Sequence, residues 1–241
     1  GRDWMTDFLR AKGDRVDIVG FPLYLSQNKQ NSPPATLAEM RANGREWEQI
    51  IPALRQLIQE TTGREIPIGI TEINSHWTSA TARETTPDSF YNAIWWADVL
   101  GHMIQQRAEM VAQFLLVSGS ENGFGLLGRY EPRPTYYVYQ MYKHFGTTLI
   151  TSSSDDADVS ITAALRADGM LTAMIVNLAD GEKQLPLEGV TGVPSQVLLF
   201  DQTHSASEIA PETVVQSNGS PVRLTLPPQS ITLLIFPAPS L

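Results

Sequence analysis

The sequence predicts an α/β region with a parallel sheet, followed by an all-β region that forms an antiparallel β-sandwich. Up to about residue 146, short β-branched runs alternate with amphipathic helical segments, which is the pattern of right-handed βα crossovers. From residue 147 onward, short alternating runs are separated by Gly, Pro and Asn, which is typical of a sandwich. We therefore expect two domains, residues 1–146 and residues 147–241.

The first region contains three apolar runs that we interpret as buried strands. They lie at residues 16–21, 66–74 and 111–117. Helices are predicted around and between them by apolar residues at helical spacing, at residues 2–12, 36–58, 87–107 and 136–145. Gly44 and Pro52 interrupt the second of these segments, so we expect a short helix followed by a longer, kinked one.

The second region begins with a hairpin, in which two alternating runs flank an Asp168-Gly169 turn. Further short strands are expected at residues 184–187, 196–200, 222–226 and 231–236. Each is bounded by turn-forming residues.

Composition excludes several classes of function. The formal charge of −9 argues against nucleic acid or an anionic membrane as a partner, since both require clustered Lys and Arg. The absence of cysteine excludes disulfides, thiolate metal sites and a cysteine nucleophile. The four histidines lack paired metal-ligand spacing and there is no phosphate-binding glycine loop, so we expect neither a metal site nor a cofactor.

The run from Ile66 to Asn74 reads as a central parallel strand that delivers one carboxylate, Glu72, at its C-terminal end. An acidic residue at that end is where an α/β barrel keeps its chemistry. The alternative is a glutamate at the edge of the sheet that is simply exposed to solvent.

The order of elements resembles the last part of the (β/α)8 barrel of clan A glycoside hydrolases. The alternating region after it resembles the small C-terminal β-sandwich that arabinofuranosidase-like and β-xylosidase-like members of this clan carry. The segments that carry the resemblance are residues 16–24, 66–74 and 111–119 as the sixth to eighth barrel strands, 134–146 as the last helix, and the alternating tail ending at 226–232. The resemblance covers nearly the whole chain and implies a partial TIM barrel made of the last three βα units.

The resemblance implies roles for two residues. The glutamate that ends the seventh strand is the catalytic nucleophile in that family, and Thr71-Glu72 matches its position. A tyrosine at the end of the sixth strand commonly hydrogen-bonds the nucleophile, and Tyr24 is the matching candidate, although it could serve only in packing. Many relatives have a histidine at the position of Pro22.

The implied reaction is glycoside hydrolysis with retention, through a covalent glycosyl intermediate. In the family, the acid/base glutamate belongs to an Asn-Glu motif on the fourth strand. No Asn-Glu dipeptide occurs in this sequence. We therefore expect the isolated chain not to hydrolyse glycosides, and consider Glu121, in the loop after the third predicted strand, a less favoured substitute acid.

Sugar-binding candidates follow Glu72 closely. Trp77 is expected to stack on a sugar ring, or else to cover the end of the barrel, while Asn74 and His76 are candidate hydroxyl ligands. Glu121 is expected to face the same cleft. Trp95 is instead expected to pack between its helix and the sheet.

Three parallel strands leave unpaired sheet edges, so we expect either an N-terminal half barrel or self-association to cover them. Two other functions stay open at this stage. One is a non-catalytic carbohydrate-binding or scaffolding protein derived from such an enzyme. The other is an unrelated α/β domain with an attached sandwich.

Overall fold

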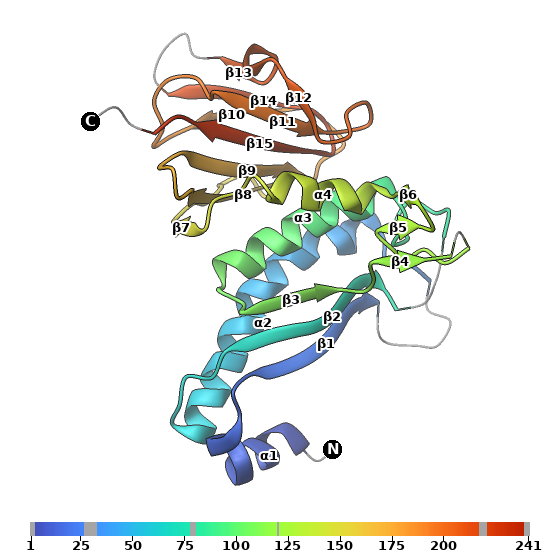
Figure 1. The fold of residues 1–241 in the computed structure, drawn as a ribbon, viewed down its shortest axis with the longest axis vertical. Helices are drawn as coiled ribbons and strands as arrows, with labels where there is room; N and C mark the ends of the chain where they lie inside the picture. The colour runs from blue at the N-terminus through green and yellow to red at the C-terminus, as the bar shows by residue number, and fades with distance from the viewer. Residues whose placement is uncertain (1–2, 27–32, 78–80, 120, 217–220, 239–241) are drawn as a thin grey trace.

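The computed structural model describes residues 3–26, 33–77, 81–119, 121–216 and 221–238. Its first part is built on a parallel sheet of order β1-β2-β3, as the sequence predicts. The strands are β1 (Val19–Ser26), β2 (Ile68–His76) and β3 (Met110–Gln113). Figure 1 shows this sheet on one side of the long helices α2 and α3, with the antiparallel sheets on the other side.

The described residues include four α-helices. They are α1 (Trp4–Lys12), α2 (Leu37–Thr62), α3 (Phe90–Gln105) and α4 (Pro134–Tyr142), with 3₁₀ turns at Gly13–Arg15 and Pro211–Thr213. The boundaries differ from the predicted ones by a few residues; α3, for example, begins after its N-cap Ser89 rather than at Pro87.

The prediction of two helices over residues 36–58 is wrong, because α2 is one helix of 26 residues that contains Pro52. A capping box between Thr36 and Glu39 starts this helix, and Gly63 ends it in the left-handed conformation. An internal proline costs a helix about 3 kcal/mol. The apolar stripe that α2 buries, including Trp47 and Ile51, offsets that cost.

Gly44 lets α2 approach α3 closely. A Cβ atom at this position would lie 1.9 Å from Asp98 Oδ2 on α3, and the Asp98 side chain is itself buried. Gly44, the other residue expected to interrupt this helix, is therefore a point of close contact between α2 and α3.

We expect Gly44→Ala to lower the free energy of unfolding by about 2 kcal/mol, because overpacking a buried site costs more than alanine gains in helix propensity. Urea denaturation measures this change. Gly181→Ala is the matched control, since a Cβ there meets nothing within 4 Å. Equal stability of the two variants would contradict the close contact.

Strand β1 runs through Pro22 to Ser26, beyond the predicted end at residue 21. Among the described residues β1 pairs only with β2, so Pro22 lies on an edge strand, where a missing N–H is tolerated. The third strand is shorter than predicted and ends at Gln113. The chain then leaves the sheet, because Leu115 and Leu116 bond instead to the backbone of residues 124–127. There a small separate sheet forms from β4 (Val117–Ser118), β5 (Leu127–Gly128) and β6 (Glu131–Pro132).

The second part contains two antiparallel sheets, as predicted. The larger has the order β12-β11-β15-β9-β8-β7, and the smaller has the order β10-β14-β13. The strands of the larger sheet are β7 (Thr148–Ile150), β8 (Val159–Leu165), β9 (Leu171–Asn177), β11 (Gln196–Phe200), β12 (Ser207–Ile209) and β15 (Ser230–Phe236). Those of the smaller sheet are β10 (Lys183–Leu187), β13 (Val215–Gln216) and β14 (Val222–Leu226).

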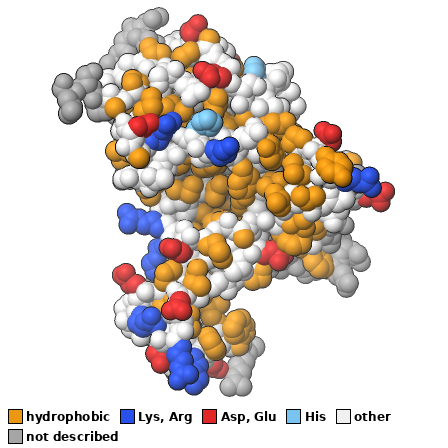
Figure 2. Space-filling model, in the orientation of Figure 1, with side chains coloured by type: hydrophobic (Ala, Val, Ile, Leu, Met, Phe, Trp, Pro, Cys, Tyr) orange, Lys and Arg blue, Asp and Glu red, His pale blue; other side chains and the backbone are white. Residues whose placement is uncertain are grey.

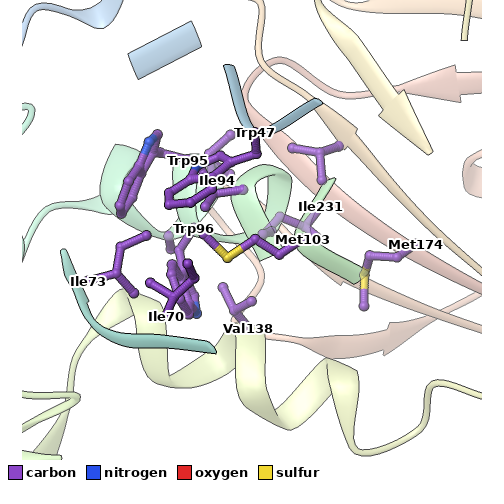
Figure 3. Close-up of a cluster of buried hydrophobic side chains, with 14 of the residues drawn as sticks. Trp47, Ile70, Ile73, Ile94, Trp95, Trp96, Met103, Val138, Met174 and Ile231 are labelled. Carbon is purple, nitrogen blue, oxygen red and sulfur yellow. The ribbon is translucent and has the colours of Figure 1, made fainter. Parts of the chain in front are cut away.

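The larger sheet is buried on both faces. One face packs on the smaller sheet through residues such as Val197, Leu224 and Leu234. The other face joins the core of the first part, and Figure 3 shows Met174 and Ile231 of this sheet near Met103 of α3. Because one hydrophobic cluster spans both parts, the division into two domains at residue 146 stays a prediction.

Helix α3 is the centre of this shared core. Most of its side chains are buried, including Trp95 and Trp96, as expected for a helix with apolar residues on all sides. Figure 3 shows Ile70 and Ile73 of β2 beside Trp96. Trp95 donates its indole N–H to Asn43 Oδ1 at 2.9 Å and thereby joins α3 to α2. Within the described ranges, no helix combines the length and apolar character needed to span a bilayer.

His102 lies between two carboxylates where α2 meets α3. Its Nε2 is 3.4 Å from Asp98 Oδ1, and its Nδ1 is 3.0 Å from Glu48 Oε1. Burial by itself lowers the pKa of His102, and so does the charge of Arg45. The interactions with Asp98 and then Glu48 outweigh both, so the pKa lies above its usual value of 6.5.

This raised pKa gives stability that depends on pH. A histidine whose pKa is higher in the folded state stabilises the fold fully below the unfolded-state value, and the contribution is lost as the pH rises through the folded-state value. We expect the stability difference between the wild type and His102→Gln to shrink as the pH rises above 6.5. Thermal unfolding across this range measures it, with the exposed His144→Gln as matched control. A constant difference would contradict the charged state of His102.

Candidate functional site

Strand β2 bulges at the position of the candidate nucleophile. Phe21 of β1 pairs with Ile70, but the next residue, Pro22, pairs with Glu72, so β2 carries one extra residue. The pairing with β3 shifts at the same place, between Ile70 and Ile73. Bulges re-aim side chains and are common beside active sites. At the bulge, Thr71 and Glu72 together lie opposite one residue of β1 and one residue of β3.

Tyr24 of β1 donates a hydrogen bond from its hydroxyl group to Glu72 Oε1. Both side chains are half-buried. Burial raises the pKa of Tyr24, and its hydrogen bond to Glu72 and the charge of that carboxylate raise it further. The phenol therefore stays protonated at neutral pH and remains a donor to one oxygen of Glu72. The structure thus brings together the two residues that the resemblance pairs.

Asn74 and His76, the candidate hydroxyl ligands, are both buried, and their role in sugar binding stays a prediction. Both side chains are about fully buried, at 0% and 1% exposure. The Asn74 amide donates to the carbonyl of Phe114 at 2.6 Å and accepts from the backbone N–H of Ser75 at 2.8 Å. Asn74 therefore connects the end of β2 to the segment that follows β3, and both its amide nitrogen and its amide oxygen already have hydrogen-bond partners.

A buried polar chain supports the end of β2, and the sequence analysis missed it. The Ser75 hydroxyl donates to Asn92 Oδ1, and the Asn92 amide donates to Thr135 Oγ1 at 2.9 Å. The three residues belong to β2, α3 and α4, and all are buried. The sequence does contain one signal for this polar chain, because Asn92 lies in the otherwise apolar helical segment Phe90 to Trp96. A polar side chain buried in such a segment needs a hydrogen-bond partner.

Trp77 is partly exposed and Glu121 is exposed. The Trp77 ring is half-buried, and its indole nitrogen is covered without a hydrogen-bond partner in the described part of the chain. Glu121 is exposed and makes no hydrogen bond or ion pair with another described residue. No interaction joins either side chain to Glu72 within the described ranges, so their roles stay predictions.

A pocket of about 220 Å³ adjoins Tyr24 on the side of α2. It is lined mainly by apolar side chains, with Glu46 as its carboxylate, and Glu72 does not line it. Among the residues that the structure describes, no group of three potential ligands is arranged to hold a metal ion.

Glu72 does not end its strand as predicted, because β2 continues four residues further, to His76, and Glu72 lies at the bulge in its middle. The fold defines a class: part of a (β/α)8 barrel followed by a β-sandwich. No protein-family model and no curated protein matches the chain. Solved structures do match it along nearly its whole length, and glycoside hydrolases are among them.

Three of these structures illustrate the likeness. CelM2, a bifunctional glucanase-xylanase from a metagenome library, is 24% identical, with a TM-score of 0.69, over 98% of this chain and 47% of that chain. A family 44 xyloglucanase from Paenibacillus polymyxa, solved with xyloglucan, is 18% identical, with a TM-score of 0.69, over 98% and 50%. A family 51 α-L-arabinofuranosidase from Bifidobacterium longum is 14% identical, with a TM-score of 0.65, over 98% and 55%.

These matches confirm the fold that the resemblance implies. At such identities they show the fold alone. The chain spans about half the length of the structures it matches.

Proposed function

We propose that this chain carries the nucleophile of a retaining glycoside hydrolase that acts on plant-type poly- or oligosaccharides, and that Glu72 is that nucleophile. The observation that supports this most is the hydrogen bond from Tyr24 to Glu72 at the bulge of β2. The similar structures include a xyloglucanase solved with xyloglucan, which favours a polysaccharide as the substrate class.

In the proposed reaction, the free oxygen of Glu72 attacks the anomeric carbon while the bond to the leaving oxygen breaks. A second carboxylic acid, about 5 Å away, protonates that oxygen and then deprotonates the water that hydrolyses the glycosyl ester. The hydrogen bond from Tyr24 fixes the orientation of the other oxygen of Glu72, so that the attacking oxygen points at the anomeric carbon. We assign the acid/base to no residue of this sequence, because it has no Asn-Glu motif.

Covalent trapping tests the nucleophile. Glycosides of 2-deoxy-2-fluoro sugars with a dinitrophenyl leaving group need no acid to depart, and they accumulate the glycosyl-enzyme because its hydrolysis is slow. We expect xylosyl, glucosyl or arabinofuranosyl members of a panel to add one glycosyl mass, mapped by peptide mass spectrometry to Glu72. A label on Glu65 or Glu121 instead would overturn the assignment.

Tyr24→Phe is expected to slow trapping about tenfold to a hundredfold, because the carboxylate loses a charge-assisted hydrogen bond that fixes its orientation. The rate of adduct formation measures this effect. Tyr136→Phe, on α4, is the matched control. Unchanged trapping by Tyr24→Phe would assign Tyr24 to packing.

The rival function, a non-catalytic carbohydrate-binding protein, is supported by the half-buried Trp77 that follows β2 directly. Calorimetric titration with xylo- and arabino-oligosaccharides separates the two. A binding protein loses affinity with Trp77→Ala and tolerates Glu72→Gln. Loss of trapping with Glu72→Gln favours the enzyme.

We further propose that the free edges of the parallel sheet are covered by a partner, either a half barrel or a second copy. Among the described residues, β1 and β3 are both edge strands. Large apolar side chains are exposed nearby, at Met110, Phe114, Leu116 and Val117. Figure 2 shows hydrophobic side chains gathered over β4 to β6 on the same side. Light scattering that shows a stable monomer would contradict self-association.

A further inference from the structure

The segment after β3 forms a short hairpin, β5 and β6, with a turn of only two residues. Gly128 pairs with Glu131, so Arg129 and Tyr130 alone join the two strands. Figure 1 shows the small sheet β4 to β6 beyond the point at which β3 ends. In α/β barrels the active site lies at the carboxyl ends of the strands, so this hairpin lies on the substrate side of a completed barrel.

Tyr130, at the tip of the hairpin, is 90% exposed, more than any other large hydrophobic side chain that the structure describes. Its neighbours Arg129 and Glu131 are exposed as well. Within the described ranges, neither the Arg129 guanidinium nor the Glu131 carboxylate forms an ion pair or a side-chain hydrogen bond. An aromatic ring, hydrogen-bond donors and hydrogen-bond acceptors are therefore all available to a ligand at one turn.

Arg133 holds the hairpin in one position. Its Nη1 donates to Ser118 Oγ at 3.0 Å and to the carbonyl of Gly125 at 3.2 Å, and its Nη2 donates to the carbonyl of Gly119 at 3.3 Å. The guanidinium also packs against Gly128, where a Cβ atom would lie 3.1 Å from Arg133 Nε. Because these contacts join β4, β5 and the end of β6, the turn is presented on a fixed backbone, which lowers the entropy lost on binding.

The two turn residues are unfavourable for the fold itself. Arg129 has a φ of 60°, in the left-handed region that favours glycine. A two-residue hairpin turn takes Gly, Asn or Asp most readily at such a position. Tyr130 in turn leaves a large ring in water, where it gains nothing from burial. Residues that weaken a structure locally are expected where they serve binding.

A sugar chain matches the groups at this turn. One face of a sugar ring presents C–H groups that stack on an aromatic ring, and its rim presents hydroxyls that both donate and accept. Tyr130 supplies the aromatic face, Arg129 supplies donors and Glu131 supplies acceptors. An apolar protein surface would instead have to cover two unpaired charges, which is unfavourable.

We infer that Tyr130, with Arg129 and Glu131, forms a distal binding site for a neutral polysaccharide chain, beyond the sugar unit at Glu72. This inference rests on the proposed function and extends its substrate from one sugar unit to a long chain. Affinity then increases with the length of the chain, and Tyr130 contributes only to chains long enough to reach it.

Calorimetric titration of the intact chain with xylohexaose and cellohexaose tests the inference, with xylose and glucose as the short probes. We expect at least one hexaose to bind more tightly than its monosaccharide. Tyr130→Ala is expected to weaken that binding about fivefold to tenfold, and Tyr130→Phe, which keeps the ring, less than about twofold. Trp4→Ala is the matched control, because Trp4 is 70% exposed on α1, at the amino end of the sheet (Figure 1).

Binding of neither hexaose would overturn the inference, and so would equal affinity of Tyr130→Ala and the wild type. An equal loss of affinity with Trp4→Ala would also overturn it, because the effect would then not belong to the turn. Light scattering adds one further outcome. A dimer that Tyr130→Ala dissociates would assign the ring to a contact between two copies and overturn the inference as well.

A double variant separates binding from stability. Arg129→Gly combined with Tyr130→Asn gives the turn residues that its backbone favours, and is expected to raise the midpoint of thermal unfolding by about 2–4 °C. The same variant is expected to lose hexaose affinity as Tyr130→Ala does. A lower midpoint than that of the wild type would show that the two residues serve the fold, and would overturn the inference.

Covalent trapping keeps this inference separate from the proposed function. Weaker hexaose binding by Tyr130→Ala, without any label on Glu72 of the wild type, would support the distal site and reject the nucleophile. A label on Glu72 together with unchanged hexaose affinity of Tyr130→Ala would support the nucleophile and reject the distal site.

Discussion

Glu72→Gln is expected to reduce glycoside turnover by roughly 10⁴-fold or more, the scale on which removing a catalytic nucleophile acts. The assay uses a barrel completed with the first five βα units of a similar glycosidase, since three strands alone do not close a barrel. The amide cannot form the glycosyl ester, although it preserves the shape of the side chain and can still accept from Tyr24. Initial rates with dinitrophenyl glycosides measure the effect.

Chemical rescue distinguishes a lost nucleophile from a disturbed fold. Glu72→Ala leaves space at the anomeric carbon, so added azide is expected to attack there and give a glycosyl azide of inverted configuration. A residue that only supports the site would give no such product. Glu65→Gln, an exposed glutamate just before the other end of β2, is the matched control and is expected to keep full activity.

The contact between Tyr24 and Glu72 could be predicted, because it depends only on which strands are neighbours and on their parallel direction. Consecutive βα units place successive strands side by side and align their C-terminal ends. The bulge at Thr71 could not be anticipated in this way. It depends on the register between strands, and neither apolar periodicity nor residue type specifies a single extra residue.

The burial of Asn74 and His76 could not be predicted for a related reason. Both lie inside β2, which continues to His76, two residues past the predicted end of the strand, and the Asn74 amide donates to the carbonyl of Phe114, in the segment after β3. Similarly, α2 continues through Pro52 because tertiary packing outweighs a local penalty. Local signals therefore predicted the helical segments and the longer strands but not short strands such as β4, β5 and β6, and contacts between distant segments decided where the elements end.

The support of β2 by Asn92 leads to the second large effect, on stability. Asn92→Ala is expected to lower the free energy of unfolding by about 3 kcal/mol, because it leaves the Ser75 and Thr135 hydroxyls buried without partners and opens a cavity. Urea denaturation measures the loss. Gln59→Ala, exposed on α2, is the matched control and is expected to be nearly neutral.

A triple variant separates the hydrogen bonds from the packing. Replacing all the members of a buried polar chain by apolar groups of similar shape can be nearly neutral, whereas removing one member is not. Asn92→Leu combined with Ser75→Ala and Thr135→Val is therefore expected to recover much of the stability that Asn92→Ala loses. If the triple variant is as unstable as the single one, packing volume rather than unsatisfied hydroxyl groups explains the loss. In that case Asn92 supports the strand that carries Glu72 by its shape alone.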